Sequence, residues 1–288
     1  MFRIKVNATT ANLCVGFDVL GMALSLENIF VFIESDSFEF DGFEPQYCSC
    51  QTNLVYKSYE YVFKKINKEL IPLKIVFKGN IPICRGLGSS SSLIVAGVFA
   101  ANYVLNNYFT EDELFDICVE LEGHPDNVAP AIMGGFVSSY KTLNGYKSIS
   151  YPVSNELKFI TVIPKYELST HEARGVLPKT LTYSNVVNNM SRIIHLPKAL
   201  ELGDLELIEE LFIDELHEPY RSKLIKEYDY IYKLCKEEKL PFCISGSGST
   251  MLIIAKDDKI VNKLNNLDCD IKVLELGSKI KIEENIYE

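Results

Sequence analysis

The spacing of apolar residues predicts a mixture of strands and helices in the first half of the chain. Apolar residues at helical spacing predict one helix that starts after Thr52-Asn53 and another that starts at Thr110 and ends at Gly123. The continuous apolar segment 93–101 predicts a buried helix. Alternating apolar and polar positions predict strands at 2–6, 28–34, 37–40, 73–77, 136–140 and 146–151.

The second half begins after a polar segment at residues 152–157 that contains a proline. A mostly helical run to about Lys239 is expected there, followed by a strand, a Gly/Ser turn and a strand over 242–254 and a helix near 257–266. Further strands are expected at 159–164, 270–276 and 279–283. Strands and helices mixed in both halves predict an α+β chain of two packed domains, 1–153 and 154–288.

One stretch joins a glycine-rich turn to an apolar helix: Pro82-Ile83-Cys84-Arg85-Gly86-Leu87-Gly88-Ser89-Ser90-Ser91-Ser92. Gly86 and Gly88 have no Cβ, so a ligand can approach the backbone closely. The helix that follows would offer unpaired N–H groups and the positive end of its dipole, which together favour phosphate. No lysine follows either glycine, which excludes a Walker A loop, and Ser91 replaces the third glycine of a dinucleotide fingerprint. A flexible linker is the alternative, but a linker would not continue directly into an apolar helix.

Two further stretches are dense in polar groups. Residues 7–18 carry many hydroxyl and amide groups beside Gly16 and Asp18, which predicts a site loop, with an ordinary Asx-capped turn as the alternative. Residues 120–130 bring carboxylates, an imidazole and an amide together at a helix end. That crowding favours a functional site over a solvated helix terminus.

Composition narrows the partners and the compartment. The chain has 288 residues, is 47% hydrophobic and carries a net charge of −10, with Lys and Arg scattered, so nucleic acid is not an expected partner. Its eight cysteines form no regular framework, and Cys48-Ser49-Cys50, the close pair, is interpreted as structural. No apolar run is long enough for a bilayer and the N-terminus does not resemble a signal peptide, so no membrane partner and a reduced cytoplasmic compartment are expected.

Several motifs in order resemble the family of galactose, homoserine, mevalonate and phosphomevalonate (GHMP) kinases. They are Thr-Thr-Ala-Asn-Leu-x-x-Gly-Phe-Asp at 9–18, Arg-Gly-Leu-Gly-Ser-Ser-Ser at 85–91 and Ser-Gly-Ser-Gly-x-Thr at 245–250. Residues 122–131, 170–174 and 218–221, with Leu177-Pro178, look like the homoserine kinase branch in particular. The similarity spans nearly the whole chain.

The resemblance implies a two-domain fold, with an N-terminal domain like ribosomal protein S5 and a C-terminal ferredoxin-like α/β sandwich. It also implies transfer of the γ-phosphoryl group of ATP to the side-chain hydroxyl of L-homoserine, a step towards threonine, with Mg²⁺ as cofactor and a homodimer as the assembly. Residues 82–92 would wrap the ATP phosphates, and Asn53 would border the adenine. Ser90, with Ser89 or Ser91 as alternatives, would hold Mg²⁺ together with Glu120, with Glu122 as the alternative carboxylate.

The resemblance, together with the pairing of opposite charges, suggests how a zwitterionic substrate would be held. Arg174 and Arg221 suit its carboxylate, because guanidinium groups pair bidentately, although each could instead form a surface ion pair. Asp18 suits the ammonium, with Asp126 as a second candidate, and Asn12 suits the hydroxyl. The predicted substrate-binding residues are Asn12, Asp18, His124, Asn127, Thr170, Arg174, Arg221 and Gly246, and the predicted catalytic residues are Asn12, Asp126 and Arg174.

The family's mevalonate and galactose branches use an aspartate base, and aligning Gly123-His124-Pro125 with them puts Ala129 at that place. The expected mechanism is therefore in-line placement without a general base, which a loose phosphoryl-transfer transition state tolerates. The chain also departs from the family pattern at Asn7, Cys14 and Ser249, where proline, glycine and proline are usual. Two alternative functions remain: a related kinase for another small carboxylate-bearing alcohol, and a non-catalytic nucleotide-binding sensor.

Overall fold

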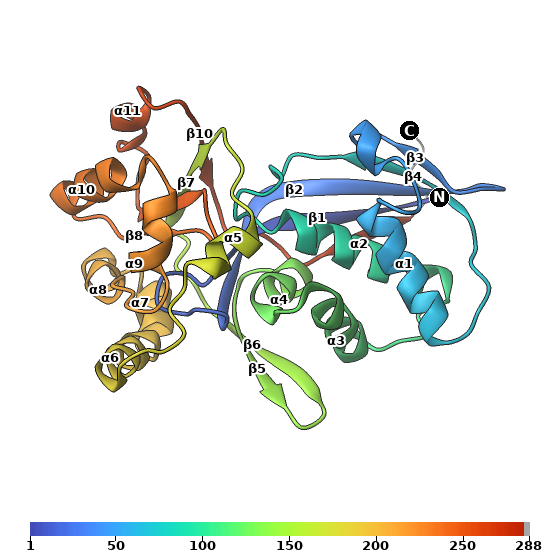
Figure 1. Ribbon diagram of the computed structural model, residues 1–288, viewed down its shortest axis with the longest axis horizontal. Coiled ribbons are helices and arrows are strands. Elements are labelled where there is room, and N and C mark those ends of the chain that lie inside the picture. The colour runs from blue at the N-terminus through green and yellow to red at the C-terminus, as the bar shows by residue number, and fades with distance from the viewer. Residues whose placement is uncertain (285–288) are drawn as a thin grey trace.

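The computed structural model describes residues 1–284, whose strands form two sheets (Figure 1). The seven-stranded sheet contains β1 (Phe2–Ala11), β2 (Leu20–Glu34), β3 (Glu39–Asp41), β4 (Leu73–Lys78), β5 (Phe136–Thr142), β6 (Gly145–Tyr151) and β11 (Lys281–Glu284). The four-stranded sheet has the order β10 (Cys269–Leu274), β7 (Lys158–Pro164), β9 (Met251–Ala255), β8 (Phe242–Ile244). All pairings are antiparallel except that of β3 with β4.

Four helices cover one face of the larger sheet (Figure 1). They are α1 (Leu54–Lys65), α2 (Ser89–Val104), α3 (Glu111–Glu122) and α4 (Pro125–Met133). Fully buried side chains such as Phe30 and Phe32 on β2, Tyr59 and Phe63 on α1 and Val95 on α2 fill the space between the layers. This apolar layer fixes the position of α2, whose first residues belong to the glycine-rich stretch.

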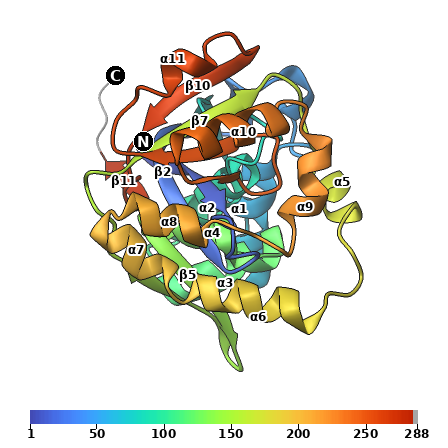
Figure 2. The same cartoon turned by 90° about the vertical axis from the view of Figure 1, so that its left-hand side faces the viewer.

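The second lobe packs short helices around the smaller sheet (Figures 1 and 2). These helices are α5 (Thr170–Gly175), α6 (Tyr183–Ile193), α7 (Leu196–Leu202), α8 (Leu205–Leu211), α9 (Glu218–Arg221), α10 (Tyr228–Glu238) and α11 (Val261–Leu264). One buried cluster in this lobe includes Ile160, Ile231 and Ile253. Another cluster joins residues of both halves, among them Leu13 and Phe159, so the two lobes share a packed core.

The last described strand returns to the first lobe. Residues of β11 pair with β1 in antiparallel register, from Phe2 opposite Glu284 to Lys5 opposite Lys281. β1 therefore lies between β11 and β2 instead of forming the edge of its sheet. The predicted division into 1–153 and 154–288 has to be corrected for this strand, because residues 281–284 belong to the sheet of the first unit.

The other expectations differ from the structure mainly at element ends. The first strand continues to Ala11, so only residues 12–18 form a loop, and the strand expected to begin at residue 28 begins at Leu20. The stretch 120–130 contains a second helix, α4, because Gly123 in a left-handed conformation (φ 96°) ends α3 and Pro125 starts the next helix at its first position. The helix expected near 257–266 is confined to α11.

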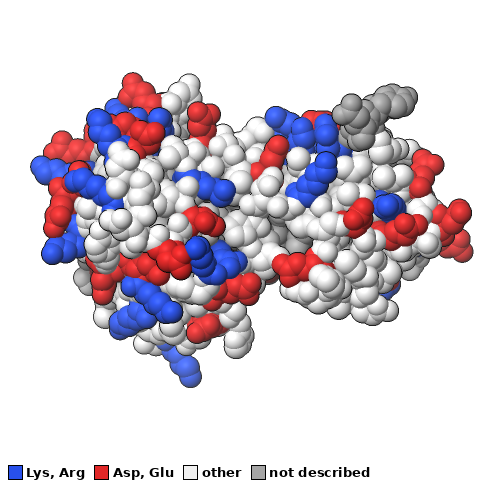
Figure 3. All heavy atoms as spheres, turned by 90° about the horizontal axis from the view of Figure 1, so that it is seen from above, with Lys and Arg blue, Asp and Glu red and all other residues white. Residues whose placement is uncertain are grey.

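The charged surface agrees with the composition. On the face shown in Figure 3, basic and acidic side chains interleave without a continuous basic stripe. Within residues 1–284, no helix has both the length and the apolar character that crossing a membrane requires.

The contact between α1 and α2 supplies a test of the packing. A Cβ added at Gly97 on α2 would lie 2.3 Å from the carbonyl oxygen of Val55 on α1, and backbone atoms cannot move aside cheaply. We expect Gly97→Ala to lower the free energy of unfolding by about 2 kcal/mol despite alanine's better helix propensity. Gly175→Ala is the control, because nothing lies within 4 Å of that added Cβ. Urea unfolding of both variants measures the difference, and equal stabilities would contradict the close approach.

Candidate active site

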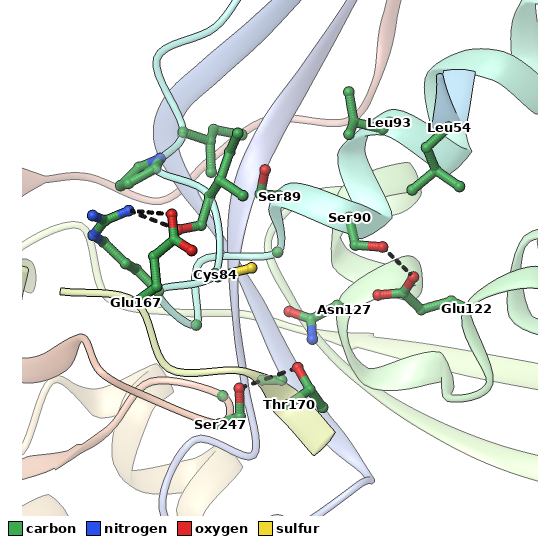
Figure 4. A pocket seen from close by; sticks show the side chains of 18 of the residues that line it. Leu54, Cys84, Ser89, Ser90, Leu93, Glu122, Asn127, Glu167, Thr170 and Ser247 are labelled. Atoms are coloured by element: carbon green, nitrogen blue, oxygen red, sulfur yellow. Dashed lines mark hydrogen bonds and ion pairs between the residues drawn. The ribbon is translucent and has the colours of Figure 1, made fainter. Parts of the chain in front are cut away.

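A cleft of about 810 Å³ lies where the two lobes meet. Its walls come from segments far apart in the sequence, including the loop after β1, the start of α1, the glycine-rich stretch, the α3–α4 junction, α5, α9 and the turn before β9. Figure 4 shows Leu54 and Leu93 at one end of this cleft, Ser89, Ser90 and Glu122 near its middle, and Thr170 with Ser247 towards the other end.

The glycine-rich stretch ends at the first turn of α2. Gly88 caps this helix in a left-handed conformation (φ 68°), and the first hydrogen bond along the helix runs from Ser92 N to Gly88 O. Among the residues described, the amides of 89–91 have no hydrogen-bond acceptor, so they are available to a ligand in the cleft. Unpaired amides at the positive end of a helix dipole form a site for an anion such as phosphate.

Both glycines are required by close contacts with other segments. A Cβ at Gly86 would lie 2.2 Å from Ser245 O, and a Cβ at Gly88 would lie 1.9 Å from Thr9 Oγ1. Backbone hydrogen bonds join the same stretch to its neighbours, from Thr9 N to Leu87 O and from Thr250 N to Arg85 O. Strands of both lobes therefore hold the loop in place.

Four residues predicted to bind phosphate, among them Arg85, have side chains that mainly contact other parts of the protein. The Arg85 guanidinium donates hydrogen bonds to the carbonyls of Ile83, Pro164 and Lys165, so its side chain supports the loop's shape. Leu87, Ser91 and Ser92 are buried and do not line the cleft, whereas the other residues of 82–90 do. Ser92 Oγ donates to Ser89 O and accepts from Asn28 Nδ2.

The carboxylate beside the serines is Glu122, and the prediction of Glu120 as the metal ligand is wrong in its geometry. Ser90 Oγ donates to Glu122 Oε2 at 2.9 Å, and Ser91 Oγ donates to Oε1 at 2.7 Å (Figure 4). Glu120 instead pairs with Lys65 at 3.1 Å and does not line the cleft. Glu120 and Glu122 are two residues apart on α3, which is more than half a helical turn. Their side chains therefore lie on different sides of the helix.

The opposite end of the cleft from Thr170 is lined by apolar and aromatic residues that the sequence did not single out. Phe43 and Phe77 stack with ring centroids 4.8 Å apart, and Tyr47 and Leu54 lie on the same wall. Asn53 lines this region too, but its side chain caps α1 by accepting from Tyr56 N and donates to Tyr47 O. Its amide is therefore already used within the protein.

Asp18 and Arg174, assigned separately to the ammonium and carboxylate of a substrate, pair with each other. Arg174 donates to both oxygens of Asp18, at 2.8 and 3.2 Å. Each side chain is 36% exposed, so the pair lies at the cleft surface and is screened by water. In this structure each residue satisfies the charge of the other, and their separate roles towards a substrate stay predictions.

Arg221 is the buried guanidinium of the cleft. Its Nη1 donates to Gly246 O and its Nε donates to Ala173 O, both at 3.2 Å, and the residue is 2% exposed. Within residues 1–284, no carboxylate forms an ion pair with it. A buried cation that lacks a counter-ion and lines a cleft is suited to an anionic ligand.

Asn12 lines the cleft, and its amide makes two hydrogen bonds within the protein. Nδ2 donates to Gly246 O at 2.7 Å, and Oδ1 accepts from Asp18 N at 3.0 Å. In this structure the side chain joins the loop after β1 to the turn containing Gly246, and the role of Asn12 in orienting a hydroxyl stays a prediction. Thr170 Oγ1 and Ser247 Oγ lie 3.4 Å apart across the same region.

Asp126, at the start of α4, has the most perturbed carboxyl group of the cleft. It is 4% exposed and its Oδ1 has no hydrogen-bond partner. Burial raises the pKa of this carboxyl to about 7, and the negative charge of Asp18 acts in the same direction. His124 Nδ1 lies 4.0 Å away, and burial lowers the pKa of His124, so this ring is not a strong counter-ion at neutral pH.

Asn127, next along α4, accepts a hydrogen bond from Thr9 Oγ1 at 2.7 Å. Asn127 lines the cleft with its Oδ1 beside Gly88, and its Nδ2 has no partner in the described part of the chain. The three departures from the family pattern lie outside these contacts. Asn7 Nδ2 donates to Ser278 O, Cys14 is buried, and Ser249 Oγ donates to Tyr166 O.

The oxygen atoms of Ser90 and Glu122 suit Mg²⁺, which prefers hard oxygen ligands and is commonly bound through one carboxylate and substrate phosphates. Residues 1–284 contain no group of three or more His, Cys, Asp or Glu side chains that could hold a metal ion alone. The donor set therefore fits a metal that arrives with a phosphate ligand.

Comparisons with known proteins identify the family of the chain. The chain matches the GHMP kinases N terminal domain over residues 53–135 and the GHMP kinases C terminal domain over 197–268. It is 41% identical to a homoserine kinase of Clostridium beijerinckii, over 96% of this chain and 93% of the relative, and 38% identical to one of Clostridium botulinum, over 98% and 97%.

Solved structures resemble the chain over its whole length as well. The crystal structure of homoserine kinase from Cytophaga hutchinsonii superposes with a TM-score of 0.84 at 27% identity, covering 98% of this chain and 96% of that one. Matched domains, full-length relatives and a shared three-dimensional fold lead to one conclusion. The chain belongs to the GHMP kinase family.

Proposed function

We propose that this protein transfers the γ-phosphoryl group of ATP to the side-chain hydroxyl of L-homoserine, forming O-phospho-L-homoserine and ADP. Full-length relatives that are homoserine kinases support the proposal. The observation that carries it is the pair of uncompensated charges in the cleft, on Arg221 and Asp126. An amino acid carries one charge of each sign and so suits both, whereas a neutral sugar would leave them unpaired.

ATP is proposed to lie along the first turn of α2. Its phosphates would accept from the free amides of residues 89–91, and its base would lie against the wall that includes Phe43, Phe77 and Leu54. This orientation directs the γ-phosphate towards Asn127 and the Arg221 end of the cleft. Ser90 and Glu122 would hold Mg²⁺, which supplies charge stabilisation on the transferring phosphoryl group.

Homoserine is proposed to lie with its carboxylate on Arg221 and its ammonium near Asp126, with the Asp18–Arg174 pair forming the adjacent wall. Free donors on Asn127 and the amides of α2 would then face the transferring group. The hydroxyl oxygen bonds to the γ-phosphorus while the bond to ADP breaks, and the hydroxyl proton leaves to solvent or to the phosphoryl oxygens. Because the transition state is loose, positioning and charge stabilisation suffice without a dedicated base.

A coupled ADP-release assay tests the proposal directly. With Mg-ATP, L-homoserine should stimulate ADP release strongly, while mevalonate, galactose, L-serine and the no-acceptor reaction should stay near background. Stimulation by a different carboxylate-bearing alcohol would show that the substrate assignment is wrong and that the protein is still a kinase. ATP binding without turnover on any acceptor would contradict the kinase and favour a nucleotide sensor.

Glu122 and Glu120 form a matched pair for testing the metal site. We expect Glu122→Gln to lower kcat by about 100-fold, because the charge that holds Mg²⁺ beside Ser90 is lost. The Mg²⁺ concentration for half-maximal activity should rise in the same variant. Glu120→Gln, which weakens surface contacts with Lys65 and Tyr61 outside the cleft, should stay within about twofold of the wild type. Similar losses in both variants would reject the assignment to Glu122.

Asp126 predicts a pH dependence for substrate binding. Its pKa is raised to about 7, so below that pH the group is neutral and cannot pair with an ammonium. kcat/KM for homoserine should therefore rise about tenfold per pH unit up to 7 and level off above it. Asp126→Asn should abolish this limb and raise KM for homoserine by about tenfold or more, with KM for ATP as the control. A fall in kcat at unchanged KM would instead identify Asp126 as a general base.

A further inference from the structure

The loop after β1 adopts a backbone that side-chain-bearing residues rarely take. Asn12, Leu13 and Cys14 have φ values of 67°, 39° and 63°, and Asp18 has a φ of 56°. Such residues persist in left-handed conformations only where their surroundings hold them. One hydrogen bond within the loop, from Gly16 N to Asn12 O at 2.8 Å, closes it. The loop carries two residues of the cleft wall, so its shape decides their positions.

Side chains of the second lobe hold the carbonyls of this loop. His217, just before α9, is fully buried, and its Nε2 lies 3.0 Å from Cys14 O. A carbonyl oxygen only accepts hydrogen bonds, so Nε2 must carry the proton. Asn189 on α6 donates to the next carbonyl, Val15 O, at 2.6 Å.

The other nitrogen of the same imidazole faces Arg221. Arg221 Nη1 lies 3.4 Å from His217 Nδ1, and because a guanidinium only donates, Nδ1 must be the unprotonated acceptor. Burial lowers the pKa of His217, with Arg221 acting in the same direction, while Asp214 and Asp18 act in the opposite direction. The ring is therefore neutral, with its single proton on Nε2.

Neighbouring groups fix the ring in this orientation. Phe17 stacks on the imidazole at 5.3 Å between centroids, and the Arg221 guanidinium lies 5.2 Å from the same phenyl ring. Asp214 Oδ2 accepts from the backbone amides of Leu216, His217 and Glu218, which holds the chain at the start of α9. Asp214 Oδ2 also lies 3.7 Å from Nε2, farther than the Cys14 carbonyl.

We propose that His217 is a positioning residue for phosphoryl transfer: one ring nitrogen holds the Arg221 guanidinium and the other holds the left-handed loop that carries Asn12 and Asp18. Arg221 and the loop that carries Asn12 and Asp18 are thereby joined through the side chain of His217, which does not itself line the cleft. The inference rests on the proposed function only for its kinetic consequence. Its structural content, the tautomer and the loop, is independent of the substrate.

Two substitutions separate the hydrogen-bonding role from mere filling of space. His217→Leu removes both bonds, and KM for homoserine should rise by about tenfold to a hundredfold while KM for ATP changes less than threefold. His217→Gln offers an N–H to Cys14 O and an oxygen to Arg221, so it should recover KM to within about threefold of the wild type. His195→Leu, at an exposed histidine, is the control and should match the wild type.

Two substrate-free measurements accompany the kinetics. Nitrogen-15 NMR of the four histidines should show the neutral Nε2–H tautomer for the signal that disappears in His217→Gln. Exchange of the Gly16 amide with solvent should be at least about tenfold faster in His217→Leu than in the wild type and His217→Gln, because its bond to Asn12 O depends on the loop's shape.

An Nδ1–H tautomer or an imidazolium would overturn the proposal, even if His217→Leu cannot be obtained folded. So would equal impairment of the Leu and Gln variants, or a Gly16 amide that is equally protected in all proteins. Should the wild type fail to phosphorylate homoserine while the tautomer and the exchange pattern are as expected, the proposed substrate is wrong and the role of His217 in holding the loop stands.

Discussion

The site depends on how closely backbone can approach backbone at Gly86 and Gly88. At these positions the glycine-rich stretch touches the turn before β9 and the strand β1 with no room for a Cβ. The contact brings the free amides of α2 to the junction of the two lobes. The side chains of Arg174 on α5 and Arg221 on α9 line the same cleft. The same junction brings Ser90 on α2 beside Glu122, and the Gly246 carbonyl of the turn before β9 accepts a hydrogen bond from Arg221.

Charge in the cleft is arranged in two different ways. Asp18 and Arg174 neutralise one another at its surface, whereas Asp126 and Arg221 are buried without strong counter-ions among the described residues. A zwitterionic ligand would neutralise both of the latter at once, so ligand charge and protein charge would complete each other. Selectivity among alcohols would then come mainly from the desolvation of these two groups, because ligands of one charge would leave the other unpaired.

Much of the fold could be predicted from the sequence, because strand alternation, helical spacing and end signals such as the Thr110 capping box are local. The family motifs similarly led to the residues that line the cleft, including Arg221 and Asn127. What remained beyond prediction depends on distant contacts. No local pattern distinguishes Glu122 from Glu120, reveals that Asn12 and Asn53 are already hydrogen-bonded, or indicates that Arg174 faces Asp18. Phe43 of the aromatic wall lies in a loop that packs against Phe77 on β4, a contact between distant residues.

The pairing of β11 with β1 also bears on how the chain acquires its structure. During synthesis, one edge of β1 must wait for residues 281–284, which follow all the other strands of both sheets in the sequence. An unpaired strand edge is a template for association with other chains, so the nascent first lobe exposes a site of misassembly until residues 281–284 have been synthesised. Pairing across this sequence separation also raises the contact order of the fold, which slows folding. Protection of this edge by chaperones would therefore matter most for partly synthesised chains.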